Sequence, residues 1–455
     1  MEQTVTDEQP RMILSAALMH GLGAEHSAWR VRAGEASDYI TPELYTDLAR
    51  TGERGKLHAL FLAEQMTNRD TGTRRPCGAM DTATVLSLMA AVTERVGLVG
   101  TGSTTYNQPY DLARRFATLD NLARGRVGWN AVTTANPATA EMYGGSWLDV
   151  HPDPKERYAR GDEFIDVVTQ LWASWEDGAI VGDKAAGIFA RPELVHEINH
   201  VGKYFSVRGP LPFPASPQGR PVMFHAGSSP TGRDQAARAA DVVFTAQHTT
   251  QAALEFRTDI RRRAAGYGRD PDLIKILPGM AVILGSTKAE AVAKKQALDD
   301  ALPMERKIAD MAKRTGLSAE LVEEYLDKPF PFGLVPPDEE FKGGIGWRRS
   351  VLNLASEEKL TVRELMYRAP GAHQHIIGTA ETVADAMQER LAAEACDGFT
   401  MMIDVLPDGL HDIVDLLVPE LQRRGMFHQD YEHQTLRDNL GLAAPRPVPT
   451  KEGRP

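Results

Sequence analysis

A short apolar run near the middle of the chain ends in small residues that could bind a phosphate. Residues 222–233 read Val-Met-Phe-His-Ala-Gly-Ser-Ser-Pro-Thr-Gly-Arg, and a helical pattern follows them. A β-strand that ends in glycine and serine before a helix directs backbone N–H groups and the positive end of the helix dipole toward one anion. The same residues also fit an ordinary strand-to-helix turn with a serine cap. The segment alone leaves both interpretations open.

The elements that must position this turn alternate along the chain. Apolar runs of strand length begin at residues 12, 59, 96, 127, 221, 241, 274 and 398, and an amphipathic run of helix length follows each. This βαβα order predicts parallel strands, and eight is the strand number of the TIM barrel. A doubly wound sheet is the competing fold, but it would carry Gly-x-Gly-x-x-Gly after the first strand, and residues 19–23 lack that spacing. We therefore predict an α/β fold, a (β/α)8 TIM barrel, as a single domain over residues 1–455.

Two segments interrupt the alternation. Residues 176–220 and 303–378 are too long for simple loops, so we predict two insertions on the barrel. Insertions between a strand and its helix lie over the carboxyl-end mouth of a barrel, where they can wall a cavity or act as a lid. Residues 443–455 are predicted to be a loose or packing tail.

The composition narrows the classes of function. The chain has 455 residues, of which 42% are hydrophobic and 25% charged, as in ordinary soluble globular proteins. A formal net charge of −11 argues against nucleic acid as a partner. The N-terminus is polar and acidic, and the chain has no apolar run of about 18 residues, so we expect neither a signal peptide nor a membrane span. Two distant cysteines, Cys77 and Cys396, fit a reduced, cytoplasmic setting.

A metal-dependent hydrolase on the same barrel is a further alternative. Such an enzyme usually carries His-x-His near its first strand, whereas this chain reads Met19-His20-Gly21-Leu22 there. We therefore predict no metal site.

Longer strings in the chain carry a resemblance to a known family. They include Leu-Phe-Leu-Ala-Glu at residues 60–64, Ser-Thr-Thr-Tyr-Asn-Gln-Pro-Tyr at 103–110 and Gly-Arg-Val-Gly-Trp-Asn-Ala-Val-Thr-Thr at 125–134. Further strings lie at residues 183–189, 207–211, 216–221, 397–399 and 418–425. On these strings the chain resembles the luciferase-like flavin monooxygenases, and most of all the group of nitrilotriacetate, EDTA and dibenzothiophene sulfone monooxygenases. The resemblance covers nearly the whole chain in the right order.

The resemblance implies a (β/α)8 barrel with insertions that uses reduced FMN, delivered by a separate NAD(P)H:flavin oxidoreductase. Dioxygen would react through a flavin C4a-peroxide, which needs a dry, covered cavity. The implied activity is oxidation of a small organic substrate with cleavage of a C–S, C–N or C–halogen bond. We favour an aromatic sulfone-like or halogenated aromatic substrate, with an aminopolycarboxylate as the alternative. A non-catalytic flavin-binding protein is the alternative from another class, and a homodimer or homotetramer is expected.

The resemblance also implies roles for particular cofactor-binding residues. Ser228 and Ser229 correspond to family serines at the FMN phosphate, and Tyr158 to a tyrosine near it. Glu64 corresponds to an aspartate beside the flavin, and Thr101 to a threonine at the end of the third strand. Without the resemblance, Glu64 would be taken for an ordinary surface carboxylate.

One position departs from the family pattern. Pro154 stands where the family commonly has a histidine near the phosphate, and proline offers no donor. His151 is the nearest histidine in sequence, but we interpret it as a solvent-exposed loop residue.

Polar side chains near strand ends are candidates for the catalytic residues. Asn130 ranks first, because an amide at the carboxyl end of a barrel strand faces the site and can both donate and accept hydrogen bonds. His20 and His26 after the first strand and His225 on the fifth could hydrogen-bond flavin or substrate. Each of these side chains also has an equally good structural interpretation.

Overall fold

The computed structural model describes residues 11–19, 22–67, 76, 79–143, 151–341, 344–371 and 373–445. The candidate His20, Cys77 and residues 446–455 of the predicted tail lie outside the described residues.

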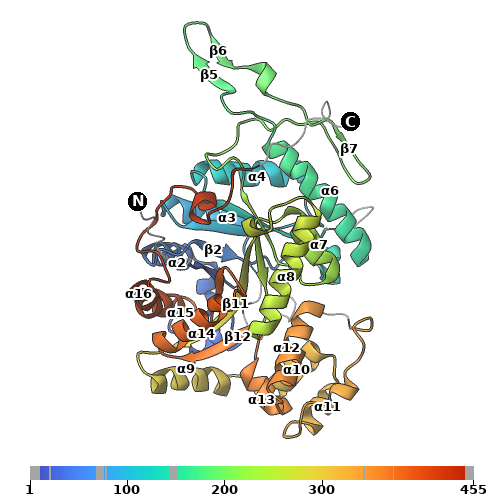
Figure 1. The fold of residues 1–455 in the computed structure, drawn as a ribbon, viewed down its shortest axis with the longest axis vertical. Coiled ribbons are helices and arrows are strands. Elements are labelled where there is room, and N and C mark those ends of the chain that lie inside the picture. The colour runs from blue at the N-terminus through green and yellow to red at the C-terminus, as the bar shows by residue number, and fades with distance from the viewer. Residues whose placement is uncertain are drawn as a thin grey trace, which may run out of the picture. The chain divides into compact units, whose positions relative to one another are not determined.

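In the described part of the chain, nine strands form the main sheet, part of which is seen in Figure 1. They are β1 (Ile13–Leu18), β2 (Ala59–Leu62), β3 (Gly97–Ser103), β4 (Val127–Val132), β9 (Val222–His225), β10 (Val242–Thr245), β11 (Lys275–Leu284), β12 (Gln374–Gly378) and β13 (Gly398–Ile403). The strand order is β10-β9-β4-β3-β2-β1-β13-β11-β12, and β10 also pairs with β11, so that eight strands close into a barrel. The eight strands of the closed barrel are all of those above except β12, and they are the eight strands predicted from the sequence. The TIM-barrel prediction is confirmed.

Strand β12 is the element that the prediction missed. Its sequence, Gln-His-Ile-Ile-Gly, is short and begins with polar residues, and it lies within the predicted insertion 303–378. Among the described strands it pairs with β11 alone, in the register Met280↔Gln374 to Leu284↔Gly378.

The predicted helices are present with small shifts at their ends. The main ones are α2 (Pro42–Arg54), α3 (Thr82–Ala91), α4 (Pro109–Leu122), α6 (Pro154–Trp172), α7 (Pro230–Ala239), α8 (Thr250–Gly266), α9 (Lys288–Asp300), α14 (Ala380–Ala392), α15 (Asp408–Asp412) and α16 (Val418–Arg423). Proline begins α2, α4, α6 and α7, where a missing backbone N–H costs no helical hydrogen bond. Side chains of Asp81, Asp153, Ser229 and Thr287 cap the starts of α3, α6, α7 and α9.

The described chain divides into two compact units, so the single-domain assignment stays a prediction. The first unit comprises residues up to 58, 244–259 and 275–431, and holds β1, β11, β12 and β13. In it β1 pairs with β13 and β13 with β11. The hydroxyls of Ser15 and Thr400, which are register partners, lie 2.9 Å apart.

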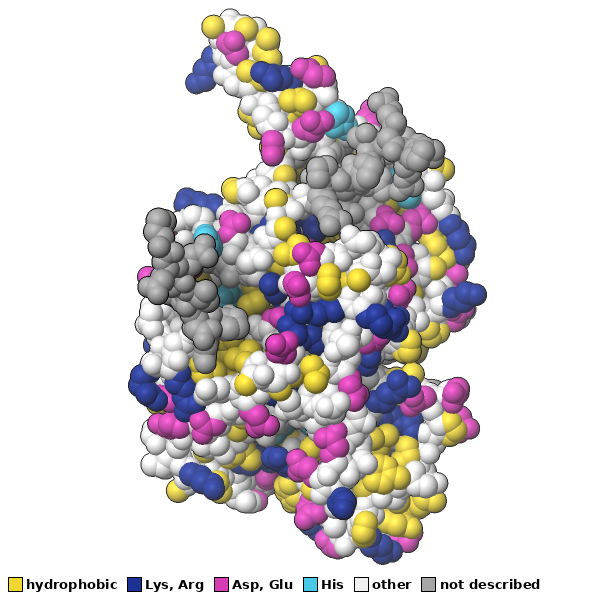
Figure 2. Space-filling view, viewed as in Figure 1, with side chains coloured by type: hydrophobic (Ala, Val, Ile, Leu, Met, Phe, Trp, Pro, Cys, Tyr) yellow, Lys and Arg dark blue, Asp and Glu magenta, His cyan; other side chains and the backbone are white. Residues whose placement is uncertain are grey.

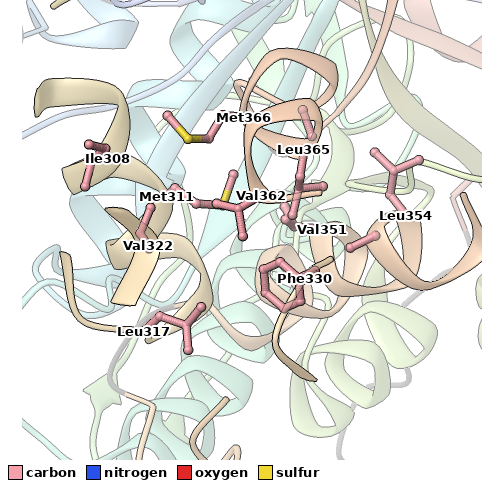
Figure 3. Packing of buried hydrophobic residues seen from close by; sticks show 12 residues of the cluster. Ile308, Met311, Leu317, Val322, Phe330, Val351, Leu354, Val362, Leu365 and Met366 are labelled. Atoms are coloured by element: carbon pink, nitrogen blue, oxygen red, sulfur yellow. The ribbon is translucent and has the colours of Figure 1, made fainter. Parts of the chain in front are cut away.

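Part of the predicted insertion 303–378 is a small helical subdomain of the first unit. It consists of α10 (Met304–Thr315), α11 (Ala319–Glu324), α12 (Ile345–Glu357) and α13 (Val362–Arg368). Apolar side chains from all four helices, and Phe330 between them, point toward one another in a core of their own (Figure 3). The insertion therefore has its own source of stability in hydrophobic burial.

The second unit comprises residues 59–243, 260–274 and the C-terminal segment from 432. It holds β2, β3, β4 and β9 in adjacent positions, with Thr101 opposite Asn130 and Asn130 opposite Phe224. Trp129 of β4 is fully buried and packs against the rings of Phe116, Phe164 and Trp172, which come from α4 and α6. These aromatic contacts fix the helices against the outer face of the sheet.

The predicted insertion 176–220 contains two antiparallel hairpins of the second unit. They pair β5 (Ile180–Asp183) with β6 (Ile188–Ala190), and β7 (His200–Val201) with β8 (Ser206–Val207). The β5–β6 hairpin extends well beyond α6 (Figure 1). Phe189 near its tip is 67% exposed.

One face of the molecule carries mixed charge (Figure 2). On the face shown in Figure 2, Lys and Arg side chains are interspersed with Asp and Glu. Within the described ranges, no helix is both long enough and apolar enough to cross a membrane.

Replacing Leu365 with alanine tests the core of the helical subdomain. Leu365 is fully buried, so Leu365→Ala should lower the free energy of unfolding of this region by about 2–5 kcal/mol. Leu334→Ala, at a side chain that is 48% exposed, should change it by less than about 0.5 kcal/mol. Hydrogen exchange of α10–α13 measures both effects. Equal exchange rates in the two variants would contradict the buried core.

Candidate functional site

Two polar side chains near the carboxyl ends of β3 and β4 are joined by a hydrogen bond. The hydroxyl of Thr101 donates to the carbonyl oxygen of Leu62 at 3.0 Å, and the side-chain amide of Asn130 donates to Thr101 Oγ1 at 3.0 Å. Both side chains are buried. Among the described residues Asn130 Oδ1 has no partner, although it is buried. Asn130 therefore retains an acceptor that a ligand could use.

Glu64 follows β2 in the same unit. Its Oε2 is buried and meets no hydrogen-bond partner in the described part of the chain. The pKa of Glu64 is raised to about 7, mainly by burial and also by the nearby Asp81 carboxylate, while Arg115 and a backbone hydrogen bond from Ser103 act to lower it. A carboxyl group with this pKa can hold or release a proton near neutral pH.

The turn between β9 and α7 brings two glycines into close approach. A Cβ atom on Gly227 would lie 2.8 Å from the Cα of Gly232, and one on Gly232 would lie 2.9 Å from the Cα of Gly227. Only glycine fits at either position without a shift of the backbone. Ser229 caps the helix by accepting a hydrogen bond from the Gly232 N–H at 3.1 Å, and the Arg233 guanidinium donates to the Ser228 carbonyl at 3.1 Å. The result is a tight cup at the positive end of a ten-residue helix.

Tyr158, in the second turn of α6, reaches this cup. Its hydroxyl lies 3.4 Å from Ser229 Oγ. The structure thus brings together Tyr158, Ser228 and Ser229, the three residues predicted at a phosphate. A helix N-terminus with serine and tyrosine hydroxyls is a suitable anion site.

His225 lies beneath the cup and faces α7. Its Nδ1 accepts a hydrogen bond from the Gly227 N–H at 2.9 Å, and its Nε2 lies 3.0 Å from Gln235 Oε1. Because Nδ1 accepts the Gly227 N–H, it carries no hydrogen, so the ring is neutral with Nε2 as the donor to Gln235. Burial also lowers the pKa of His225. Both ring nitrogens are occupied by the protein. The catalytic role of His225 stays a prediction, and these contacts favour a positioning role instead.

Sequence reasoning missed Arg157 and left His151 outside the site. Arg157 is buried and donates from Nη1 to the Thr134 carbonyl at 2.8 Å, and its Nε has no partner among the described residues. His151 Nδ1 lies 2.8 Å from the hydroxyl of Tyr106, while its Nε2 is buried and unpaired within the described ranges. Arg157 could have been noticed in the sequence because it directly precedes Tyr158 in the helix.

Pro154 is the first residue of α6, a position where proline is well tolerated. It offers the site no donor. The other sequence candidate, His26, belongs to the first unit, where its Nδ1 lies 2.9 Å from Asp310 Oδ2. No group of three or more His, Cys, Asp or Glu residues in the described part of the chain is arranged to hold a metal ion.

The pH dependence of stability tests the burial of Glu64. Its raised pKa means that the folded protein binds a proton more tightly than the unfolded chain. The free energy of unfolding of the wild type should therefore fall relative to Glu64→Gln as pH rises from about 5 to about 8. Chemical denaturation of both proteins across this range measures the difference in their free energies of unfolding. The other buried carboxyl groups contribute equally to both proteins, so their contributions cancel in this difference. A difference that is independent of pH would contradict the raised pKa.

The chain is similar to known proteins over most of its length. The sequence profile of the luciferase-like monooxygenase family matches residues 23–398. Nitrilotriacetate monooxygenase component A of Aminobacter aminovorans is 41% identical over 93% of this chain and 95% of its own. Dibenzothiophene-sulfone monooxygenase of Rhodococcus erythropolis is 37% identical over 94% of this chain and 95% of its own.

Two solved structures resemble the whole chain. EDTA monooxygenase from Chelativorans sp. BNC1 superposes with a TM-score of 0.80 at 34% identity, over 95% of this chain and 99% of that one. Riboflavin lyase, solved with a modified FMN and riboflavin, has a TM-score of 0.80 at 30% identity, over 95% of this chain and 96% of that one. The chain belongs to the luciferase-like monooxygenase family.

Proposed function

We propose that the chain is the oxygenase component of a two-component, FMNH2-dependent monooxygenase. The observation that carries this proposal is the cup at the start of α7, where Ser229 Oγ and the Tyr158 hydroxyl lie 3.4 Å apart at the positive end of the helix. FMN has one terminal phosphate, which matches one such anion site. The modified FMN in the related riboflavin lyase structure supports the choice of cofactor.

The chain's own residues have distinct roles in this proposal. Ser228, Ser229 and Tyr158 bind the phosphate with neutral donors, and Arg157 supplies positive charge nearby. Thr101 and Glu64 line the flavin site, with the Thr101 hydroxyl held by the Leu62 carbonyl. When bound in its reduced form, FMN supplies the electrons that activate dioxygen.

Asn130 is the proposed catalytic contact. Its amide nitrogen is tied to Thr101, so the free Oδ1 is held in a fixed orientation. A preoriented acceptor can position a flavin or substrate N–H or O–H group. Glu64, with its pKa of about 7, can hold or release a proton in the same site. The role of His20 stays a prediction.

The substrate proposal is a small organic molecule that loses a C–S, C–N or C–halogen bond, with an aromatic sulfone-like or halogenated aromatic compound preferred. An aminopolycarboxylate is the alternative, and the 41% identity to nitrilotriacetate monooxygenase component A is the reason to keep it. We further propose a separate NAD(P)H:flavin oxidoreductase as the partner, and a homodimer or homotetramer.

Aerobic incubation with FMN, NADH and a flavin reductase tests the function. We expect substrate-dependent oxygen uptake with at least one compound from a panel of sulfones, aromatic halides and aminopolycarboxylates. FMN binding without uptake on any of them would favour the non-catalytic flavin-binding alternative. Absence of FMN binding in both redox states would reject both flavin proposals.

The double variant Ser228→Ala/Ser229→Ala tests the cup. It removes two hydroxyls, each contributing about 0.5–1.5 kcal/mol to a hydrogen bond, so FMN should bind roughly tenfold more weakly or worse. Fluorescence quenching of FMN on titration with protein measures the affinity. Ser286→Ala, at an exposed serine after β11, is the matched control and should leave the affinity unchanged. Wild-type affinity in the double variant would place the phosphate elsewhere.

A further inference from the structure

Several polar atoms without partners lie in the second unit, where the loop after β3 contacts the start of α6. His151 Nε2, Arg157 Nε and Thr105 Oγ1 are buried and have no hydrogen-bond partner within the described ranges. Arg157 is only 8% exposed, and His151 is partly buried. Buried polar groups without partners are uncommon in proteins, so three of them close to the candidate site indicate a ligand.

Tyr106 holds the ring of His151. The Tyr106 hydroxyl lies 2.8 Å from His151 Nδ1, and the two rings are stacked with their centroids 6.4 Å apart. A tyrosine hydroxyl can donate to Nδ1 of a neutral ring or accept from Nδ1 of a protonated ring. In both of these states Nε2 carries a hydrogen. An anion at Nε2 favours them over the neutral ring with its hydrogen on Nδ1, so the inference does not depend on the tautomer of the free protein.

Arg157 acts on His151 and on residues at the cup at the start of α7. Burial, and then the positive charge of Arg157, lower the pKa of His151. Burial lowers the pKa of Arg157 itself, and the next residue, Tyr158, opposes that shift. The Tyr158 hydroxyl lies 3.4 Å from Ser229 Oγ. His151, Arg157 and the Tyr158–Ser229 pair therefore belong to one region of the second unit.

The contacts of Arg157 leave its charge available to a ligand. Its Nη1 donates to the neutral carbonyl of Thr134 at 2.8 Å. Asp153, a carboxylate that influences the pKa of Arg157, caps the start of α6 by accepting from the Glu156 N–H. A buried cation is costly unless an anion compensates it. This side of the site is therefore suited to a negatively charged group.

We infer that His151 and Arg157 bind the FMN phosphate from the side of α6, together with the cup at the start of α7. The inference rests on the proposed function and adds a binding residue, His151, that Tyr106 holds in place. His151, Tyr158, Ser228 and Ser229 are all partly buried, so a phosphate can reach them from solvent. A phosphate monoester carries about two negative charges at neutral pH, and Arg157 supplies the positive charge that hydroxyl groups lack.

The departure at Pro154 agrees with this assignment. Pro154 is exposed at the first position of α6 and offers no donor. His151 lies three residues earlier in the same segment and has a buried ring nitrogen without a partner among the described residues. His151 therefore takes the place of the histidine that the family pattern would put at residue 154.

The affinities for FMN and riboflavin isolate the contribution of the phosphate, because the two flavins differ only in that group. His151→Ala should weaken FMN binding about tenfold in fluorescence titrations and leave riboflavin binding unchanged. His433→Ala, at an exposed histidine of the same unit, is the matched control and should bind both flavins like the wild type. Wild-type affinity of His151→Ala for both flavins would overturn the inference.

Returning a histidine to residue 154 distinguishes a phosphate contact from a structural role. In His151→Ala/Pro154→His the imidazole is placed at the first position of α6, which does not require proline. The double variant should regain most of the FMN affinity that His151→Ala loses, again without a change in riboflavin binding. FMN binding as weak as in His151→Ala would contradict the replacement of one histidine by the other.

Should His151→Ala lose affinity for both flavins, Tyr106→Phe provides the second test. It keeps the ring beside His151 but removes the hydroxyl that holds Nδ1, so FMN binding alone should weaken by about threefold to tenfold. Unchanged FMN affinity, or an equal loss for both flavins, would overturn the inference. Binding of neither flavin by the wild type would instead reject the proposed function.

Discussion

The close approach of Gly227 to Gly232 is the constraint on which the candidate flavin site depends. Because neither position has room for a Cβ atom, the chain can turn sharply from β9 into α7. His225 holds the turn from below by accepting from the Gly227 N–H, and Gln235 of α7 holds His225. The helix N-terminus is thereby fixed at the carboxyl end of the sheet, with the Ser229 cap facing Tyr158. A phosphate bound there would meet donors that need no rearrangement.

The remaining site residues depend on strand register and burial. Thr101 and Asn130 are register partners on β3 and β4, so their side chains lie on the same face and can bond to each other. That bond uses the donor of Asn130 and leaves its acceptor unpaired. Glu64 likewise keeps an unpaired oxygen, with a pKa raised to about 7 by burial. Unpaired buried groups of this kind are costly, and they cluster where proteins bind ligands.

Much of this architecture could be predicted from the sequence. The eight barrel strands are continuous apolar runs, as expected for strands buried on both faces, and helix starts are marked by proline and by capping residues. Strand β12 was not predicted, because its five residues begin with glutamine and histidine and lie inside a long predicted insertion. The helical subdomain was expected only as an insertion, because its core joins residues from Ile308 to Ala369 that local patterns do not connect.

The site was harder to predict than the fold. Sequence alone could not tell which face of β9 carries His225, and the structure shows it facing α7 with both nitrogens bonded. Arg157 and His151 were passed over because burial, which gives them their unpaired nitrogens, is a tertiary property.

Comparing FMN with riboflavin as ligands tests the phosphate cup most directly, since the two differ only in the phosphate. If the start of α7 binds that phosphate, the protein should bind FMN at least about tenfold more tightly than riboflavin in fluorescence titrations. Equal affinities for the two flavins would contradict a phosphate site at Ser228 and Ser229.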